Sequence, residues 1–187
     1  MQIEYMPGTL MPWSMMNSKA FELFEPMISA TGGLSLSQVC SITGLETSTI
    51  QNWIKRGLVA KPIEKKYYER QLARILLINS LRDSMQLDKI QLLLKHLNGL
   101  VDDEADDIIR EGQLYNYLCT IISSINFESG LSDSKISQAV KDTIADYIGP
   151  FEDSSLKLYK GLTLMAVAFV SGVLKNKADT LYNELLN

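Results

Sequence analysis

Two short helical patterns separated by a tight glycine turn constrain the fold of this chain more than any other feature. The first pattern covers residues 36–42, and the second begins at residue 46 or 47 and ends at 56. Between them stands Thr43-Gly44-Leu45, in which the glycine supplies a turn conformation that other residues resist. Gly57 follows the second pattern as a helix C-terminal cap. Two short helices around such a turn are typical of a helix-turn-helix.

The second helix divides into an apolar face and a polar face. Ile50, Trp53 and Ile54 fall on the apolar face, at the spacing of three and four residues that a helix requires. The polar face offers an amide pair, which can match adenine edges, and a cation for guanine or phosphate. In a helix-turn-helix the second helix lies in the major groove, so we expect this face to read double-stranded DNA. The candidate contacts are Thr47, Ser48, Gln51, Asn52, Lys55 and Arg56.

The segment after Gly57 predicts a small β-hairpin. Leu58-Val59-Ala60 and Tyr67-Tyr68 are apolar or aromatic stretches, and the residues between them form a short basic loop. A hairpin at this position of a helix-turn-helix is a wing, and its lysines contact phosphates, which position a protein without specifying sequence. The candidate contacts in the wing are Lys61, Lys65, Lys66 and Tyr67.

The distribution of charge agrees with a surface for a polyanion. Residues 30–98 carry ten Lys and Arg against five Asp and Glu, a local balance of +5. The rest of the chain carries eight against seventeen, a balance of −9, so that the net charge is −4. A basic segment inside an acidic protein favours nucleic acid as the partner of that segment.

The same segment resembles the winged-helix head of MerR-type transcription regulators. The resemblance rests on Leu36-x-x-Val39-Cys40-x-x-Thr43-Gly44-Leu45-x-x-x-Thr49-Ile50-x-x-Trp53-x-x-x-Gly57-Leu58, then Pro62, then Lys66-Tyr67-Tyr68. It covers residues 34–97 and implies two further helices, at 69–84 and 87–97, behind the wing. More narrowly, the whole pattern is similar to an uncharacterised family of Firmicute proteins known only as a domain of unknown function.

Three departures from the MerR pattern alter the contacts that the resemblance implies. Glu46-Thr47 replaces the usual serine cap of the second helix, and Gln51-Asn52 replaces an arginine and a tyrosine. Lys66 stands where the family has a wing arginine, and a lysine cannot form a bidentate fork with phosphate. The tail also lacks the effector cysteines of metal-sensing members, so metal sensing is not implied.

The rest of the chain is predicted to be helical, apart from its first residues. We expect an irregular segment with a short helix at 19–30, and tail helices at 102–125, from 132 or 133 to 148, and from 154 or 155 to 174 or beyond. The fold class is therefore mostly α, with a winged helix-turn-helix head followed by an all-helical C-terminal domain. The expected domains are 1–33, 34–98 and 99–187.

The last helix predicts a homodimer. It is apolar on nearly every side, and such a helix must be buried on most of its surface. The other tail helices are short, so we expect a second copy to cover it, although a helix central to its own bundle is the alternative. The expected dimer stripe is Leu158, Leu162, Met165, Phe169 and Val173, and a second apolar stripe is Leu164, Val167, Ala168 and Leu174.

Few side chains suit a metal, a cofactor or catalysis. Cys40, Cys119 and the single histidine, His96, offer almost nothing from which to build a zinc site. The acidic run at 102–107 lacks the glycine and the terminal glutamate of an EF-hand loop and is typical of a helix first turn. Because no Gly-rich phosphate loop or Ser-His-Asp set is visible, we expect no enzyme activity, metal or cofactor.

The sequence also predicts the compartment. The first sixteen residues lack the basic start and continuous apolar run of a signal peptide. No run reaches the roughly 18 apolar residues of a membrane span. We therefore expect a cytoplasmic protein with no membrane partner.

These features predict a sequence-specific DNA-binding transcriptional regulator that acts as a homodimer on double-stranded DNA. Two alternatives stay open. One is a protein–protein interaction module on a helix-turn-helix scaffold, and the other is a ligand-sensing regulator with a pocket for a small-molecule effector in the helical tail. Binding to a duplex weakens steeply with salt through counterion release, whereas binding through an apolar patch does not.

Overall fold

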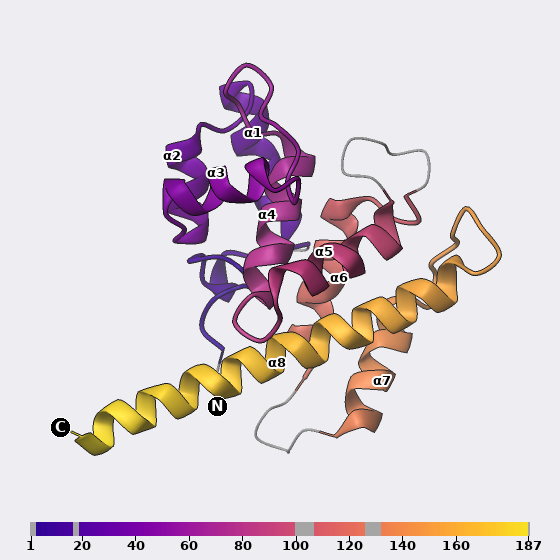
Figure 1. Ribbon diagram of the computed structural model, residues 1–187. Coiled ribbons are helices and arrows are strands. Elements are labelled where there is room, and N and C mark those ends of the chain that lie inside the picture. Colours follow the sequence, from indigo (N-terminus) through magenta and orange to yellow (C-terminus); the bar gives the residue numbers. More distant parts are fainter. Residues whose placement is uncertain (1–2, 17–18, 100–106, 126–131, 187) are drawn as a thin grey trace.

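The computed structural model describes residues 3–16, 19–99, 107–125 and 132–186, and within these the chain folds as helices. Figure 1 labels the α-helices in chain order. Two short 3-10 helices, η1 and η2, precede them. The elements are η1 (Trp13–Met15), η2 (Phe21–Leu23), α1 (Glu25–Thr31), α2 (Leu36–Thr43), α3 (Thr47–Lys55), α4 (Glu69–Leu81), α5 (Leu87–Asn98), α6 (Glu111–Ser124), α7 (Asp133–Thr143) and α8 (Ser154–Leu186).

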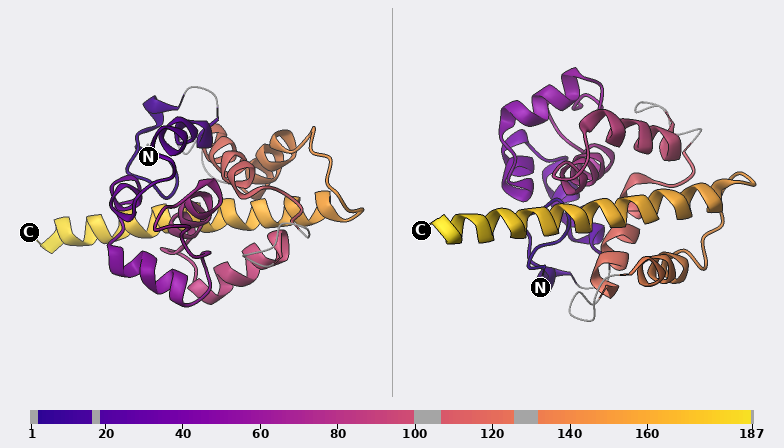
Figure 2. Two further views of the ribbon diagram at one scale, coloured as in Figure 1. Left: turned by 90° about the horizontal axis from the view of Figure 1, so that it is seen from above. Right: turned by 60° about the horizontal axis from the view of Figure 1, so that its bottom comes forward.

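Helix α4 lies at the centre of the fold. It packs against α2, α5, α6 and α8, and nearly all of its side chains are buried. Both further views show the other helices arranged around it (Figure 2). The expected boundary after residue 98 is crossed by this packing, since α6 and α8 lie beyond it. The division into 1–33, 34–98 and 99–187 stays a prediction.

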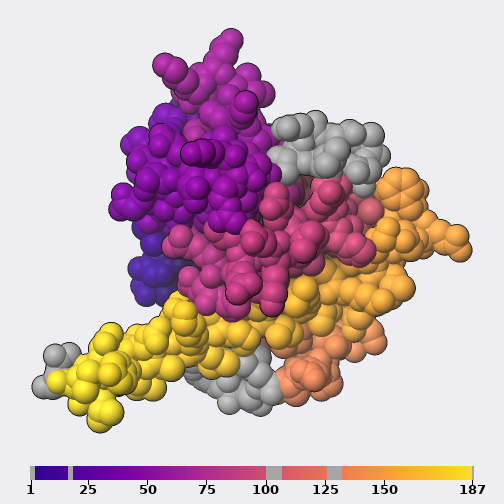
Figure 3. All heavy atoms as spheres, in the orientation of Figure 1, coloured from indigo at the N-terminus to yellow at the C-terminus, as the bar shows by residue number. Residues whose placement is uncertain are grey.

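Helix α8 spans the molecule and continues past it. Its 33 residues correspond to about 50 Å of helix. The first part packs against α4, α5, α6 and α7, whereas the last part projects beyond the body (Figure 3). Among the described residues, α8 is long and apolar enough to cross a membrane by length and composition, with a mean hydropathy of 1.4 over 18 residues. Half of that window is buried inside the protein, as in the core helix of a globular fold.

The predominance of helices is confirmed, but the predicted β-hairpin wing is wrong. The described residues contain isolated bridges and no strand. Ile63 and Lys66 exchange two backbone hydrogen bonds, of 3.0 and 2.8 Å, across a two-residue turn. The next residues to exchange hydrogen bonds in such a ladder would be Lys61 and Tyr68, but both bond to the side chain of Gln71 instead. The N–H of Tyr68 donates to Oε1 of Gln71, at 3.0 Å, and Nε2 of Gln71 donates to the carbonyl of Lys61, at 3.3 Å. Tyr67 exchanges its two backbone bonds with Leu34, in front of α2. The residues between α3 and α4 are therefore a protruding loop closed by one tight turn.

Three helix boundaries also differ from the prediction. The helix expected at 102–125 begins only at Glu111, as α6, because the described residues 107–110 are not helical. The helix expected from residue 19 begins only at α1, where Pro26 lies in the first turn, the one place in which a helix tolerates proline. Helix α7 ends at Thr143 rather than at residue 148, because Ile144 leaves the helical conformation. The side chain of Ser132 caps α7, as expected, by accepting a hydrogen bond from the N–H of Lys135.

Candidate nucleic-acid interface

Local caps fix the start of the helix pair. Ser35 and Gln38 form a capping box, in which each side chain accepts a hydrogen bond from the other residue's N–H, at 3.3 and 2.8 Å. Gly44 ends α2 with φ +71°, in the left-handed region that favours glycine. The turn of residues 44–46 then leads directly into α3.

A residue of α4 holds this turn against the core. The Nδ2 atom of Asn79 donates to the carbonyl oxygens of Thr43, at 3.0 Å, and Gly8, at 2.9 Å. One side chain thus ties the turn and the N-terminal segment to the central helix. The backbone N–H of Leu10 also donates to the carbonyl of Ile42, at 2.8 Å. These bonds fix the direction in which α3 leaves the turn.

Helix α3 presents the two faces that its sequence predicts. Ile50 and Trp53 are fully buried against the core. We call the residues on the opposite side the α3 face, and all four are exposed. They are Ser48, Gln51, Asn52 and Lys55. Thr47 and Arg56, at the two ends of the helix, are exposed as well.

The loop of residues 57–67 adds cations on one side of α3. Lys61 and Lys65 are exposed, and Gln51 of the α3 face lines a shallow groove together with Lys65. The Nε2 atom of Gln71 donates to the carbonyl of Lys61, at 3.3 Å, which ties the loop to α4. Glu64 and Lys65 both have positive φ, as the tip of a two-residue hairpin turn requires.

Two side chains of this loop that were predicted to contact DNA bind to other parts of the protein instead. The ammonium of Lys66 lies 3.4 Å from the carbonyl oxygen of Thr31 and 3.3 Å from that of Gly33, at the end of α1. Tyr67 is buried beside Leu34, and burial raises the pKa of its hydroxyl. Neither side chain is free to contact a phosphate without leaving its place.

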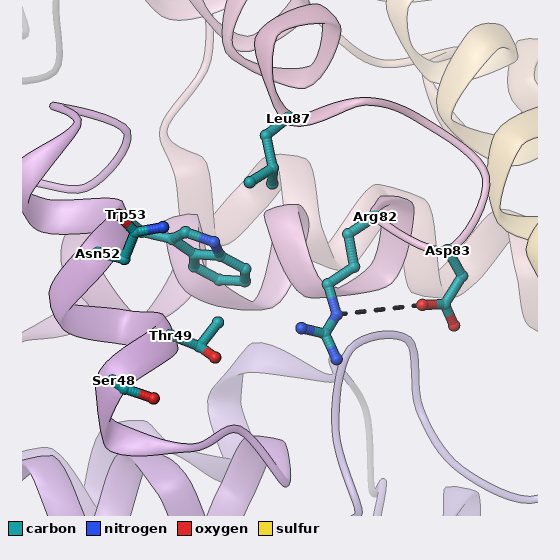
Figure 4. Close-up of a pocket in the computed structure, with 7 residues that line it drawn as sticks. All are labelled: Ser48, Thr49, Asn52, Trp53, Arg82, Asp83 and Leu87. Atoms are coloured by element: carbon teal, nitrogen blue, oxygen red, sulfur yellow. Dashed lines mark ion pairs between the residues drawn. The ribbon is translucent and has the colours of Figure 1, made fainter.

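A cleft on the other side of α3 contains a cation that sequence reasoning missed. Ser48 and Asn52 line it together with Arg82, which follows α4 (Figure 4). The cleft has a volume of about 540 Å³, and the Nε atom of Arg82 lies 4.0 Å from Oδ1 of Asp83. No local pattern places Arg82 beside α3, because the two are brought together only by the tertiary fold, in which α2 packs against both α3 and α4.

One of the residues predicted to contact DNA, Arg56, forms an ion pair with an aspartate of the protein. The Nη2 atom of Arg56 lies 2.5 Å from Oδ1 of Asp88, in the first turn of α5. The two side chains are 40% and 79% exposed, so that water screens this ion pair. Arg56 is therefore engaged, whereas Lys55 forms no ion pair among the residues that the structure describes.

A buried ion pair supports the interface from behind. The Nη1 atom of Arg74 in α4 lies 2.5 Å from Oε1 of Glu111, the first residue of α6, and both side chains are almost fully buried. The Nε atom of Arg74 donates to the carbonyl of Leu58, at 3.1 Å. One guanidinium thus connects the start of the 57–67 loop, the central helix and the first helix of the tail.

The predicted dimer stripe lies inside the chain's own core. Four of its residues are buried and Val173 is half-buried. They pack toward α4, α5, α6 and α7, which between them cover the first part of α8. The homodimer stays a prediction, and the buried residues of this stripe are not available to form it. The stripe consists of Leu158, Leu162, Met165, Phe169 and Val173.

The described residues hold no group of three or more His, Cys, Asp or Glu side chains suited to a metal ion. Burial raises the pKa of Cys119 to about 12, and it also raises the pKa of Cys40. Of the acidic run at 102–107, residues 102–106 lie outside the described residues. Asp107 pairs with Arg70, at 3.7 Å.

Comparisons with known proteins identify relatives. The chain is 27% identical over 99 residues to "Uncharacterized protein YkrK" of Bacillus subtilis (strain 168), in an alignment that covers 51% of this chain. That alignment spans 42% of the relative, less than half of its length. No solved structure matches the chain.

A family model matches residues 25–118, which run from α1 into α6 and include both partners of the buried ion pair. Its description is "Domain of unknown function (DUF1836)". The expected likeness to an uncharacterised family of Firmicute type is confirmed, while the MerR likeness stays a prediction. Because the matched residues make up half of the chain, the protein belongs to the DUF1836 family.

Proposed function

We propose that the protein is a sequence-specific transcriptional regulator that binds double-stranded DNA through α3 and the 57–67 loop. The observation that carries this proposal is the position of the α3 face between two cations. Gln51 shares a groove with Lys65 on one side, and Asn52 shares a cleft with Arg82 on the other. An exposed helix with amides at its centre and cations on both flanks suits the major groove and the phosphates beside it.

The proposal assigns different roles to the exposed side chains. Gln51 and Asn52 supply the base contacts, because an amide can bond to both N6 and N7 of adenine. Lys55, Lys61 and Lys65 contact phosphates and set the orientation of the protein on the duplex. Ser48 and Thr47 contact the DNA backbone beside the start of α3. Arg82 adds a further phosphate contact on the side of α5.

The likeness to MerR-type regulators supports the same proposal. In a helix-turn-helix the first helix crosses the DNA backbone and the second lies in the groove. Helices α2 and α3 are joined by the short glycine turn that this arrangement needs. The contacts assigned here differ from the MerR pattern in that Lys66 and Tyr67 serve the core rather than the DNA.

Selection from random duplexes with the purified protein tests this function. We expect one enriched motif, and Asn52→Ala should then relax its preference at one base pair, with a loss of about 1–3 kcal/mol. Lys55→Glu should abolish tight binding, because the new carboxylate faces phosphate. Lys160→Glu, an equally exposed change on α8, is the matched control and should bind as the wild type does. The absence of any enriched motif, or unchanged affinity in both α3 variants, would remove α3 from a DNA interface.

A protein-binding role is the second candidate, and one observation favours it. The groove beside Gln51 has a volume of about 440 Å³ and apolar walls that include Leu36, Ile54 and Tyr67. Ile63, at the nearby turn, is 58% exposed. A partner protein bound there would be insensitive to salt, and Ile63→Ser would weaken its binding without changing the affinity for a duplex.

A ligand-sensing role would need a site in the tail. A cavity of about 690 Å³ lies between the N-terminal segment, α4 and α6, and charged side chains dominate its lining, among them Arg70, Arg110 and Glu111. This lining favours a polar effector over an apolar one. Thermal stabilisation of the protein by such a compound, abolished by Arg110→Ala, would identify it as the effector site.

A further inference from the structure

An apolar stripe on α8 faces away from the body of the protein. Leu164, Val167, Leu174, Leu181 and Leu185 are 41–82% exposed, although four of the five are leucine. Together with Ser171 and Ala178 they recur at alternating intervals of three and four residues. This is the a and d spacing of a helix that packs along a second helix.

The opposite side of α8 is the one that contacts the body. The Nδ2 atom of Asn176 donates to Oδ2 of Asp83, at 3.0 Å, and Gly172 lies against the same aspartate. Among the residues that the structure describes, no element covers the C-terminal part of the apolar stripe, while Leu164 and Val167 near its start are partly covered. Exposed apolar surface that is continuous in this way marks an interaction site.

The part of the stripe that is open to a second helix is the C-terminal arm, which we define as residues 174–186. Every residue of the arm is exposed. Lys175 and Asn176, at its base, still reach Asp83 of the body, and from Lys177 onward the arm projects about 15 Å beyond the body, at the yellow end of the chain in Figure 3. Leu174 lies at the base of the arm and Leu185 at its tip. No other element of the described structure covers it.

We propose that the C-terminal arms of two copies pair side by side in opposite directions. The two-fold axis passes between residues 179 and 180. Leu174 of each copy then packs against Leu185 of the other, and Ala178 packs against Leu181. The pairing ends at Leu174, where Lys175 and Asn176 on the other side of α8 contact the body, so the two bodies lie at opposite ends of the pair.

The charges on the arm select a second copy as the partner and fix the register. Lys177 and Glu184 flank the stripe on the same side, seven residues or about 10 Å apart, which is too far for an ion pair within one helix. In the proposed register each faces the other residue of the second copy, so that two equivalent ion pairs form. A shift by one heptad would instead place Lys177 of one copy opposite Lys177 of the other, where the two ammonium groups repel each other. Parallel pairing would place Lys177 beside Tyr182 of the other copy, which offers no anion.

The interface covers about two heptads, which is short compared with a standard protein interface, so we expect association in roughly the micromolar range. This inference concerns self-association alone and stands whether or not α3 binds DNA. Because all the residues involved are exposed in the single chain, variants of the arm should fold as the wild type does.

Sedimentation of the full-length protein across a range of about 1–100 μM tests the proposal. We expect a monomer–dimer equilibrium, and Leu181→Asp should leave only monomer. Lys177→Glu and Glu184→Lys should each weaken the dimer by about 10-fold or more, since each creates two like-charge contacts. The double variant Lys177→Glu/Glu184→Lys restores the opposite charges and should recover the wild-type dissociation constant to within about threefold.

Lys141→Glu, an exposed change on α7, is the matched control and should leave the dimer unchanged. A wild-type protein that is monomeric throughout the concentration range would overturn the proposal. A monomer that binds lipid vesicles through α8 would overturn it as well. A dimer that survives Leu181→Asp would place the interface elsewhere. A double variant as weak as the two single variants would refute the antiparallel register.

Discussion

Replacing Arg74 with methionine should remove a large part of the stability of this fold. The change leaves the carboxylate of Glu111, 3% exposed, without the cation that now lies 2.5 Å away. It also takes the guanidinium donor from the carbonyl of Leu58. Removing one partner of a buried ion pair costs about 3–5 kcal/mol, because an uncompensated charge stays in the interior. Against a total of roughly 5–15 kcal/mol for a typical protein, that is a substantial fraction.

Urea denaturation followed by circular dichroism measures this loss. The double variant Arg74→Met/Glu111→Met, in which neither charge remains, should recover most of it, since an apolar pair of similar volume can replace a buried ion pair at little cost. The exposed ion pair of Arg56 and Asp88 is the control, and Arg56→Met should change the free energy of unfolding by at most about 1 kcal/mol.

Two results would refute the reasoning about Arg74. A loss below about 1 kcal/mol in Arg74→Met would mean that the pair is as weakly coupled as a surface pair. A double variant that loses as much as the two single variants together would mean that the side chains act independently, through shape rather than charge.

Three further changes have defined outcomes. Asp88→Asn frees Arg56, so duplex affinity measured by fluorescence anisotropy should rise, whereas an unchanged affinity would place Arg56 away from DNA. Glu64→Asn should raise the urea midpoint by relieving part of the roughly 1–2 kcal/mol cost of a left-handed residue, while Glu64→Gln should not. Burial raises the pKa of Cys119 from about 9 to about 12, so the neutral thiol contributes stability that is complete below pH 9 and is lost as the pH rises toward 12. The free energy of unfolding of the wild type should therefore decline from pH 8 to 10.5, and Cys119→Ala should lessen that decline by about 2 kcal/mol. An equal decline in both proteins would contradict the last of these.

Local signals explain why the helix pair could be predicted from the sequence. The caps of α2, from Ser35 to Gly44, involve residues at most a few positions apart. The inward side of α3 follows from the spacing of Ile50 and Trp53 alone. Such interactions depend on neighbours along the chain, so the sequence contains them in full.

The features that were mispredicted or missed depend on distant partners. Tyr67-Tyr68 has the pattern of a hairpin strand, yet Tyr67 pairs with Leu34, which precedes α2, and the N–H of Tyr68 bonds to the side chain of Gln71 rather than to Lys61. Arg82 enters the α3 cleft only because the tertiary fold places the end of α4 beside α3, with α2 packed against both helices. For α8, an apolar stripe that packs in the chain's own core has the same spacing as one that faces a second chain, so the sequence could not distinguish Leu162 from Leu181.

The salt dependence of duplex binding tests the central claim of a DNA-binding face most directly. With a duplex obtained by selection, the logarithm of the affinity should fall linearly with the logarithm of salt concentration, by about 0.9 per phosphate neutralised. Replacing Lys55, Lys61 and Lys65 together with alanine should flatten that slope by about 3 units. The exposed lysines at 141 and 160 serve as a control pair whose replacement leaves the slope unchanged. A slope that is the same in the wild type and the triple variant, or no binding to any duplex at low salt, would contradict the account.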